Sequence, residues 1–193
     1  NLIYKRVLIS ELVERCGLDH AVVRAVRERA ACMVNPFRCK LLHKKASLAV
    51  LSDEANRGLF SPAQAAAIDQ HIPWTRIVAE RKTAFGGQTV DLVPFIAEHR
   101  ANLVLKPNDE YGGKGVALGW LMNPADWESN VQLALNEPYI VQERVAIPSE
   151  PYPLMHDGKI EFAEQMLDTN PLVFYGDYVD GCLSRLSGEA LLN

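Results

Sequence analysis

The most constraining feature of this sequence is a glycine-rich segment that follows a short apolar run ending in a lysine. Residues 103–107 (Leu-Val-Leu-Lys-Pro) are predicted to form a strand that carries Lys106 to its end, where the proline stops it. Gly112, Gly113 and Gly115 then let the backbone approach a ligand that side chains would keep away. Residues 116–120 are predicted to return as a second strand. The unit is therefore predicted to be a β-hairpin with a glycine-rich flap, whose fixed cation and exposed N–H groups suit the phosphates of a nucleotide.

The spacing of these residues excludes two commoner phosphate-binding loops. The P-loop requires glycine where Asn108 stands and serine or threonine where Gly115 stands, and it opens a helix instead of a hairpin. The dinucleotide-binding fingerprint requires a third glycine where Leu118 stands. The flap therefore predicts a phosphate site of another kind.

The composition is that of an ordinary globular protein and narrows the range of partners. The 193 residues, of which 48% are hydrophobic and 23% charged, suffice for one substantial core or two small lobes. A net charge of −4, with no basic block longer than residues 43–45, argues against a nucleic-acid partner. No apolar run approaches about 18 residues, the length typical of a membrane span, and no signal-peptide pattern is present. Neither a nucleic acid nor a membrane is therefore expected as a partner.

The four cysteines indicate a cytoplasmic protein. Cys16, Cys32, Cys39 and Cys182 form no C-x-x-C pair and have no matching histidine spacing, so we expect reduced and mostly buried thiols. We also expect the chain to be a C-terminal fragment of a longer protein, because it starts at Asn1 directly before an apolar run and stops at Asn193 without a polar tail.

Hydrophobic periodicity and turn signals predict an α+β protein with helices concentrated in the first half and hairpins in the second. Helices are expected over residues 11–16, 19–30, 40–51, 61–70, 124–135 and from 91 onward. Strands are expected over 31–34, 75–78, 103–107, 116–120 and 139–145, and hairpins over 154–164 and 172–186. This order favours two α+β lobes built on antiparallel sheets.

The ordered set of motifs resembles the ATP-grasp superfamily, in which ATP lies between two α+β lobes. The segments that resemble its circularly permuted branch, which includes the glutathionylspermidine synthases, are residues 34–38 (VNPFR), 43–46 (HKKA), 105–107 (LKP), 112–116 (GGKGV) and 152–158 (YPLMHDG). The resemblance covers essentially the whole chain. It implies a circularly permuted ATP-grasp fold, divided into the remnant of a preceding α/β domain (1–43), the central lobe with its flap (44–141), and the hinge with part of the large lobe (142–193).

The resemblance implies a role for each cation and for the flap. Lys45 matches the first phosphate-binding lysine, at the start of a helix, with Lys44 as the alternative in a register shifted by one. Lys106 matches the second lysine, which contacts the α- and β-phosphates. The glycines that match the flap over the phosphates are Gly112, Gly113 and Gly115.

The resemblance also implies a nucleoside site and a catalytic arginine. The residues that match the inter-lobe hinge, where strand-edge backbone groups meet the adenine, are Gln142, Glu143, Arg144, Val145 and Ala146. Glu150 falls where the family places a carboxylate on the ribose hydroxyls. Arg185 matches an arginine that reaches the transferring phosphoryl group, where it would stabilise charge developing in the transition state.

The magnesium ligands of the family find no match here. The family uses carboxylates that include a Glu-x-Asn pair, whereas Glu161 and Glu164 have alanine and methionine two positions later. In the permuted branch the corresponding strands precede this segment, so the ligands are expected upstream of Asn1. Glu164 is the local candidate, and no metal ligand is assigned.

The implied activity of the intact protein is that of an ATP- and Mg²⁺-dependent ligase, which joins a small or peptide-like carboxylate to an amine through an acyl phosphate. Two other functions stay open: a nucleotide-binding regulatory or scaffold module without ligase chemistry, and an α+β interaction domain whose glycines only make a long turn. Each site residue also has a structural alternative, since strand-end lysines, helical lysine pairs and arginines on β-surfaces are commonly just solvated. No oligomeric state is predicted.

Overall fold

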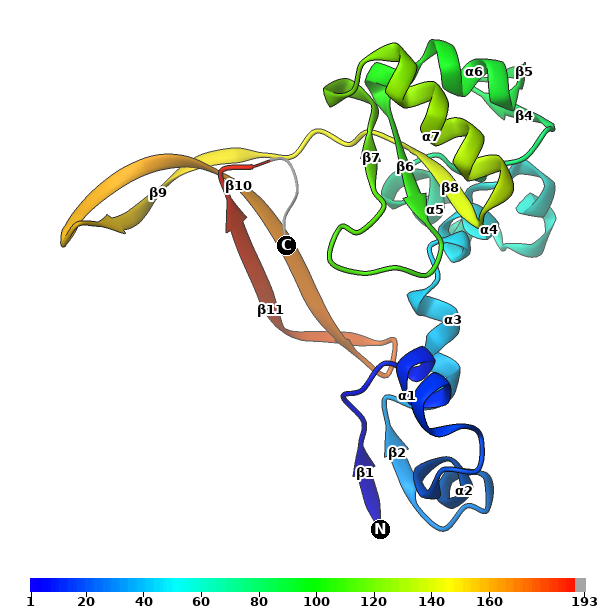
Figure 1. The fold of residues 1–193 in the computed structure, drawn as a ribbon, viewed down its shortest axis with the longest axis vertical. Helices are drawn as coiled ribbons and strands as arrows, with labels where there is room; N and C mark the ends of the chain where they lie inside the picture. The colour runs from blue at the N-terminus through cyan, green and yellow to red at the C-terminus, as the bar shows by residue number, and fades with distance from the viewer. Residues whose placement is uncertain (190–193) are drawn as a thin grey trace.

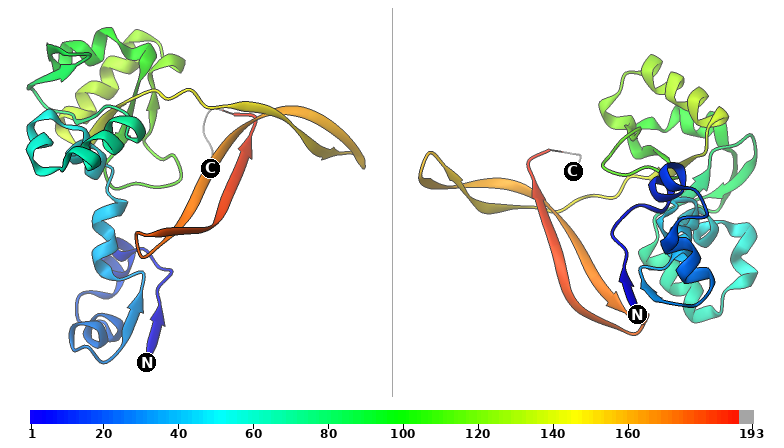
Figure 2. Two further views of the ribbon diagram at one scale, coloured as in Figure 1. Left: turned by 180° about the vertical axis from the view of Figure 1, so that it is seen from behind. Right: turned by 60° about the horizontal axis from the view of Figure 1, so that its bottom comes forward.

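The computed structural model describes residues 1–189 and shows a mixed α+β protein with several antiparallel sheets. Figure 1 shows three regions: an N-terminal unit (residues 1–34), a central body (residues 46–143), and a long C-terminal ribbon of strands (residues 149–187) that projects from the body. The two further views in Figure 2 show the same projecting ribbon. The predicted α+β class is confirmed at this level.

The N-terminal unit is a small βααβ arrangement. Its elements are β1 (Leu2–Tyr4), α1 (Ile9–Cys16), α2 (Ala21–Arg27) and β2 (Cys32–Val34). The two strands pair in parallel, with Ile3 opposite Met33. Met33 and Leu12 are the buried apolar side chains of this unit, so its core is small.

The central body is built on a four-stranded sheet with strand order β3-β8-β6-β7, paired antiparallel throughout. The elements from its start to the first sheet strand are α4 (Ala46–Ser52), η2 (Glu54–Leu59), α5 (Pro62–His71) and β3 (Thr75–Ile77). Those that follow are β4 (Lys82–Phe85), β5 (Gln88–Asp91), α6 (Leu92–Glu98), η3 (Arg100–Asn102), β6 (Leu103–Pro107), β7 (Ala117–Leu118), η4 (Gly119–Leu121), α7 (Pro124–Asn136) and β8 (Tyr139–Glu143).

One face of this sheet packs against α6 and α7 to form the main core. The core cluster includes Ile96 of α6 and Trp127 and Val131 of α7, all nearly or fully buried. Leu105 and Val141 of the sheet belong to the same cluster and lie opposite each other in the β6–β8 register. Because side chains alternate between the faces of a strand, Val104, Lys106 and Gln142 point to the other face. The apolar packing of one face therefore fixes Lys106 and Gln142 on the opposite one.

The predicted flap is confirmed as the loop between the paired strands β6 and β7, but β7 is shorter than expected. It covers Ala117–Leu118, and the chain then turns into η4 instead of continuing to residue 120. Gly119 lies so close to Arg100 that a Cβ atom there would be 1.9 Å from the Arg100 carbonyl oxygen. The side chain of Arg100 in turn donates to Gly119 O at 3.0 Å. This close approach ends the strand.

The single helix predicted over residues 40–51 is wrong. The structure has η1 (Phe37–Cys39), α3 (Lys40–His43) and then α4, separated by Lys44 in an extended conformation with ψ 126°. The break is stabilised by Asn108 at the base of the flap, whose carbonyl accepts from the Lys45 N–H at 3.0 Å. Its side-chain oxygen accepts from the Ala46 N–H at 2.9 Å and so caps α4. A residue remote in sequence therefore sets where this helix begins.

The C-terminal ribbon is a three-stranded antiparallel sheet of β9 (Ser149–His156), β10 (Lys159–Phe174) and β11 (Tyr178–Ser187). β10 pairs with β9 along its first half and with β11 along its second, so both predicted hairpins are confirmed. Few side chains in the ribbon are buried, and Met155 and Phe162 are each 71% exposed. The ribbon is therefore held together by its hydrogen-bond ladders more than by a core.

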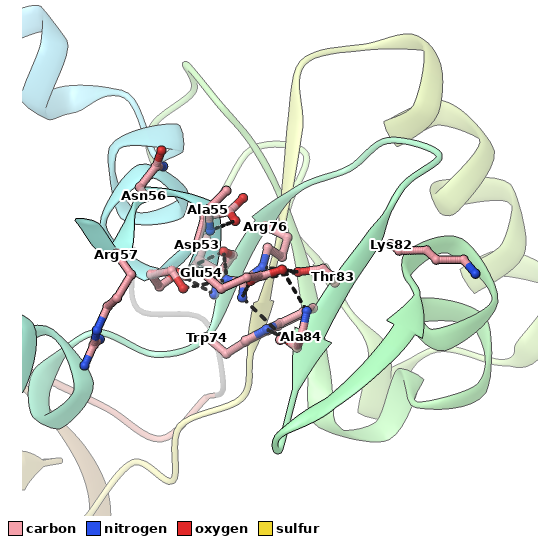
Figure 3. Close-up of polar contacts among 12 residues, drawn as sticks. Asp53, Glu54, Ala55, Asn56, Arg57, Trp74, Arg76, Lys82, Thr83 and Ala84 are labelled. Atoms are coloured by element: carbon pink, nitrogen blue, oxygen red, sulfur yellow. Dashed lines mark hydrogen bonds and ion pairs between the residues drawn. The ribbon is translucent and has the colours of Figure 1, made fainter. Parts of the chain in front are cut away.

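A buried arginine ties the edge of the sheet to the β4–β5 hairpin and to η2 (Figure 3). The Arg76 side chain is 2% exposed and its guanidinium donates to Glu54 at 2.5 Å, to Thr83 at 2.6 Å and to the Ser52 carbonyl at 2.9 Å. Because its donors are paired with protein acceptors, this charged cluster is structural. Within residues 1–189, every buried side-chain N or O atom has a hydrogen-bond partner.

The exposure of the cysteines differs from the expectation. The prediction of mostly buried thiols is wrong: the four cysteines are free, three are exposed and Cys39 is half-buried. In the described part of the chain, no helix combines the length and apolarity needed to cross a bilayer.

Candidate functional site

A cavity of about 570 Å³ lies where the central body meets the C-terminal ribbon. It is lined by the non-core face of the sheet, the flap, the residue before α4, the segment after β8, and parts of β10 and β11. The lining residues are Lys45, Val104, Lys106, Gly112, Gly113, Val116, Leu118, Trp120, Gln142, Glu143, Arg144, Val145, Ile147, Met166 and Arg185. The predicted phosphate-binding lysines, two flap glycines, the hinge segment and the predicted catalytic arginine thus surround one space.

Lys106 is the most enclosed cation of this cavity. Its ammonium donates one hydrogen bond, to Gln142 Oε1 at 2.8 Å. Burial lowers the pKa of Lys106, and the nearby charge of Lys45 lowers it further. A lysine ammonium has three N–H donors, and no second acceptor is found among residues 1–189. Two donors of Lys106 are therefore left for a ligand.

Lys45 approaches the cavity from the residue before α4. Its ammonium donates to the Glu110 carbonyl at the base of the flap at 2.6 Å. Burial lowers the pKa of Lys45, while Asp109 and Glu110 act in the opposite direction. The alternative residue, Lys44, points elsewhere and forms an ion pair with Asp109 at 3.5 Å. The structure therefore places Lys45, and not Lys44, at the cavity.

The flap carries its glycines in conformations that favour glycine. Gly112, Gly113 and Gly115 have φ of 61°, 71° and 70°, in the left-handed region. Gly112 and Gly113 line the cavity, whereas Gly115 packs against the sheet. A Cβ atom at Gly115 would be 2.8 Å from the Pro107 side chain and 3.0 Å from the Tyr139 hydroxyl oxygen. Gly115 therefore anchors the flap, and the other two glycines face the cavity.

The segment after β8 forms the end of the cavity away from the lysines. Gln142 lies between β3 and β6, so its backbone groups face neighbouring strands and its side chain faces the cavity. The N–H of Glu143 donates to the Trp74 carbonyl at 2.9 Å, and that of Arg144 to the Asn102 carbonyl at 2.8 Å. Within the described chain, the first N–H of this segment without a partner is that of Val145. Any backbone N–H contact from this segment to a ligand therefore begins at Val145.

The cavity also has an apolar end, which the sequence did not predict. Val104, Leu118 and Trp120 come from the flap hairpin and η4, and Ile147 and Met166 from the ribbon and its approach. The guanidinium of Arg144 lies over the Trp120 ring, 4.3 Å from its centre, a cation–π geometry. No signal marks these residues in the sequence, because alternating apolar residues in strands look the same whether they face a core or a cavity.

Arg185 reaches the cavity from β11. It lies opposite Asp168 in the β10–β11 register and forms an ion pair with that carboxylate, with Nε to Oδ2 at 2.8 Å. A hydrogen bond from Asn170 and the pairing with Arg185 lower the pKa of Asp168. Arg185 is thus a further cation of the lining, beside Lys45, Lys106 and Arg144, and its carboxylate partner is on the ribbon itself.

Two predicted carboxylates lie outside the cavity lining. Glu150 is exposed on β9, opposite Gln165 in the ladder. Glu164 accepts from the Ser149 hydroxyl at 2.9 Å on the same strand pair. Among residues 1–189, no group of three or more His, Cys, Asp or Glu side chains is placed to hold a metal ion. The lining itself contains one carboxylate, Glu143, so the described residues do not fit a carboxylate-held metal.

Comparison with known proteins finds no matching family model, no matching curated protein and no matching solved structure. The evidence for a function therefore comes from the geometry and charge of this cavity.

Proposed function

We propose that the cavity binds ATP, with the triphosphate between Lys45, Lys106 and Arg185 under the flap and the adenine at the apolar end near Val145. The observation that carries this proposal is that Lys45 and Lys106, far apart in sequence, meet in one cavity beneath a glycine-rich loop. We further propose that the fold is a circularly permuted ATP-grasp arrangement, as the order of motifs suggests.

The state of the two lysines supports a phosphate ligand. Both have a pKa lowered by burial, so each is a partly desolvated cation. Each donates to one neutral oxygen, of Gln142 and of the Glu110 backbone respectively, and not to a carboxylate. Polyanionic phosphate oxygens would accept the remaining donors and would offset the mutual repulsion of the lysines. An apolar ligand would leave both charges uncompensated.

We also propose that the protein is a carboxylate–amine ligase. A carboxylate oxygen of the first substrate would attack the γ-phosphorus of ATP, releasing ADP and forming an acyl phosphate. The amine of a second substrate would then attack the acyl carbon, releasing phosphate and forming an amide. The cations would position the phosphates, and Arg185 would stabilise charge on the transferring group. No step is assigned to Mg²⁺, because the described residues do not form a site for it; a cytoplasmic location and small or peptide-like substrates remain part of the proposal.

A second function, nucleotide binding without ligase chemistry, is favoured by one observation. The cavity lining offers a single carboxylate, Glu143, and none of the described residues forms an acidic cluster for a metal. A regulatory or scaffold module would need the cations and the flap but no metal site.

Binding of a nucleotide series tests the phosphate assignment. ATP should bind more tightly than ADP, AMP and adenosine, measured by calorimetry, because each added phosphate meets the three cations. Lys106→Met should weaken ATP binding about tenfold or more and leave adenosine binding unchanged. The matched control is Lys82→Met, since Lys82 is exposed on β4 and points away from the network drawn in Figure 3. Equal affinity of the wild type for adenosine and ATP would refute the proposal.

Formation of ADP separates the two functions. A ligase should release ADP from ATP when a carboxylate and an amine are supplied with Mg²⁺. Arg185→Gln should slow this release by a larger factor than it weakens ATP binding, because charge develops on the transferring group in the transition state. Tight ATP binding with no ADP formation under any such pair would favour the binding module.

A further inference from the structure

Gln142 lies between a buried threonine and the cavity lysine. Its side-chain Nε2 donates to Thr75 Oγ1 at 2.8 Å, and its Oε1 accepts from Lys106 Nζ at 2.8 Å. Gln142 is 6% exposed and Thr75 is fully buried. These three side chains, on β3, β8 and β6, form one hydrogen-bonded chain, here called the Thr75–Gln142–Lys106 relay.

The direction of this relay is set at its buried end. The Thr75 hydroxyl has one proton, which it donates to the Pro73 carbonyl at 2.8 Å. A carbonyl can only accept, so Thr75 Oγ1 must accept from Gln142 and the amide must turn its NH₂ group toward Thr75. The amide oxygen of Gln142 therefore faces Lys106. With the opposite orientation, an NH₂ group would meet an ammonium, and two donors would face each other.

We propose that Thr75 is a positioning residue for the triphosphate site, acting through the side chain of Gln142 to hold the Lys106 ammonium in the cavity. Thr75 does not line the cavity, so it can influence a ligand only through its neighbours. This role rests on the proposed function, whereas the orientation of the relay does not.

The backbone of Thr75 is held firmly enough to serve this purpose. Its N–H donates to Ser52 Oγ at 3.1 Å, and its carbonyl accepts from Ser52 Oγ at 2.9 Å and from Arg76 at 2.8 Å. The charged side chains that share the cavity with Lys106 are Lys45, Glu143, Arg144 and Arg185. Within the described chain Lys106 makes no ion pair, so the Gln142 oxygen is its one counterpart.

The test compares Thr75→Val with Thr75→Ser. Valine keeps the branched shape but loses the hydroxyl, which frees the Gln142 amide to turn, whereas serine keeps the hydroxyl. Thr75→Val should weaken ATP binding about tenfold with adenosine affinity unchanged, and Thr75→Ser should bind ATP like the wild type. A residue that only stabilises the fold would lower the unfolding midpoint of Thr75→Val without changing the ratio of ATP to adenosine affinity, and that result would overturn the proposal.

A second measurement needs no nucleotide. Acetic anhydride acetylates uncharged amines, so the pH dependence of Lys106 acetylation, quantified by mass spectrometry, reports how well its charge is stabilised. In Thr75→Val the acetylation curve of Lys106 should move to lower pH, because an amide oxygen that the hydroxyl no longer holds in place stabilises the charged form less. In Thr75→Ser the curve should coincide with that of the wild type. An unmoved curve in Thr75→Val would refute the relay even if ATP binds. A moved curve in a protein that does not prefer ATP to adenosine would support the relay and refute the proposed function.

Discussion

Asp109 forms ion pairs with basic side chains at the base of the flap. Its carboxylate pairs with Lys40 at 2.5 Å and with Lys44 at 3.5 Å, and His43 lies 3.3 Å away. Burial alone would raise the pKa of Asp109, but hydrogen bonding and charge from Lys40 and Lys44 bring it below its ordinary value. Lys40, His43 and Lys44 lie at Asp109 and do not line the cavity. Lys45 is the basic residue of this segment that does.

The lowered pKa of Asp109 predicts an acid-sensitive contribution to stability. Because the folded-state pKa lies below the unfolded one, the contribution is complete above about pH 4 and is lost as pH falls through the folded-state pKa. Asp109→Asn should lower the free energy of unfolding at pH 7 by about 1 kcal/mol, a figure discounted for the solvent exposure of the pair. The difference from the wild type should shrink as the pH falls from 4 toward 2, as measured by urea denaturation.

Asp180→Asn is the matched control, because Asp180 is exposed on β11 and, among residues 1–189, makes no hydrogen bond or ion pair through its side chain. It should change stability little at either pH. If the free energy of unfolding of Asp109→Asn stayed equally far below that of the wild type at pH 2, the lost stability would not come from the ion pairs.

At the scale of elements, the flap hairpin combines a rigid base with an open tip. Gly115 at the base packs against Pro107 and Tyr139, whose hydroxyl also lies 3.3 Å from the Gly115 carbonyl. Gly112 at the tip has a similar φ but no atom within 4 Å of a Cβ position. The same substitution at the two glycines therefore separates the conformational cost from the packing cost.

Gly115→Ala should destabilise the protein by about 2–3 kcal/mol, because the left-handed conformation costs about 1 kcal/mol and the added methyl group forces Pro107 or Tyr139 to move. Gly112→Ala should cost only the conformational term of about 1 kcal/mol. Urea denaturation of both variants measures the difference. Equal losses would mean that the flap base adapts freely and that Gly115 is not an anchor.

The flap, the hairpins and the helices with a clear cap could be predicted because their signals are local. Ser61, for example, directly precedes Pro62 in the sequence, and in the structure it accepts from Gln64 N as the N-cap of α5. The break before α4 could not be predicted, since Asn108 causes it across a long sequence separation. Local propensity cannot detect a helix cap that tertiary contact supplies.

The same distinction applies to the candidate site. Lys106 was predictable because it stands at a strand end before a glycine-rich loop, whereas Lys45 was expected only from the family resemblance. The structure places both at the cavity. The apolar end of the cavity was not predictable, because Trp120 and Met166 resemble ordinary core residues in the sequence. Glu150 was expected from the family resemblance alone, and β9 carries it to an exposed position outside the cavity.

At the scale of the whole molecule, stability is unevenly distributed. The fully buried side chains, including Trp127, Leu105 and Ile140, all belong to the central body. The ribbon contributes Gln165 as its one buried side chain in the described chain, and an extended sheet without a core is marginal in water. The cavity lies at the junction of the two regions, with Met166 and Arg185 supplied by the ribbon. A ligand bound there would link a stable body to a weakly stabilised ribbon.

Hydrogen exchange should show this link directly. Without nucleotide, the amides of β6 and β8 should exchange slowly and those of the ribbon quickly, because local opening is easiest where little apolar surface is buried. ATP should slow exchange in the flap and around Met166 and Arg185, which line the cavity, but not at the hairpin ends near residues 157 and 176, which do not. Lys106→Met should remove the ATP-dependent protection while leaving the slow exchange of β6 and β8 intact. Two results would contradict this prediction: ATP-dependent protection at the hairpin ends instead of around Met166 and Arg185, or equal protection in the Lys106→Met variant. Either would mean that ATP contacts the ribbon elsewhere and that the cavity does not join the two regions.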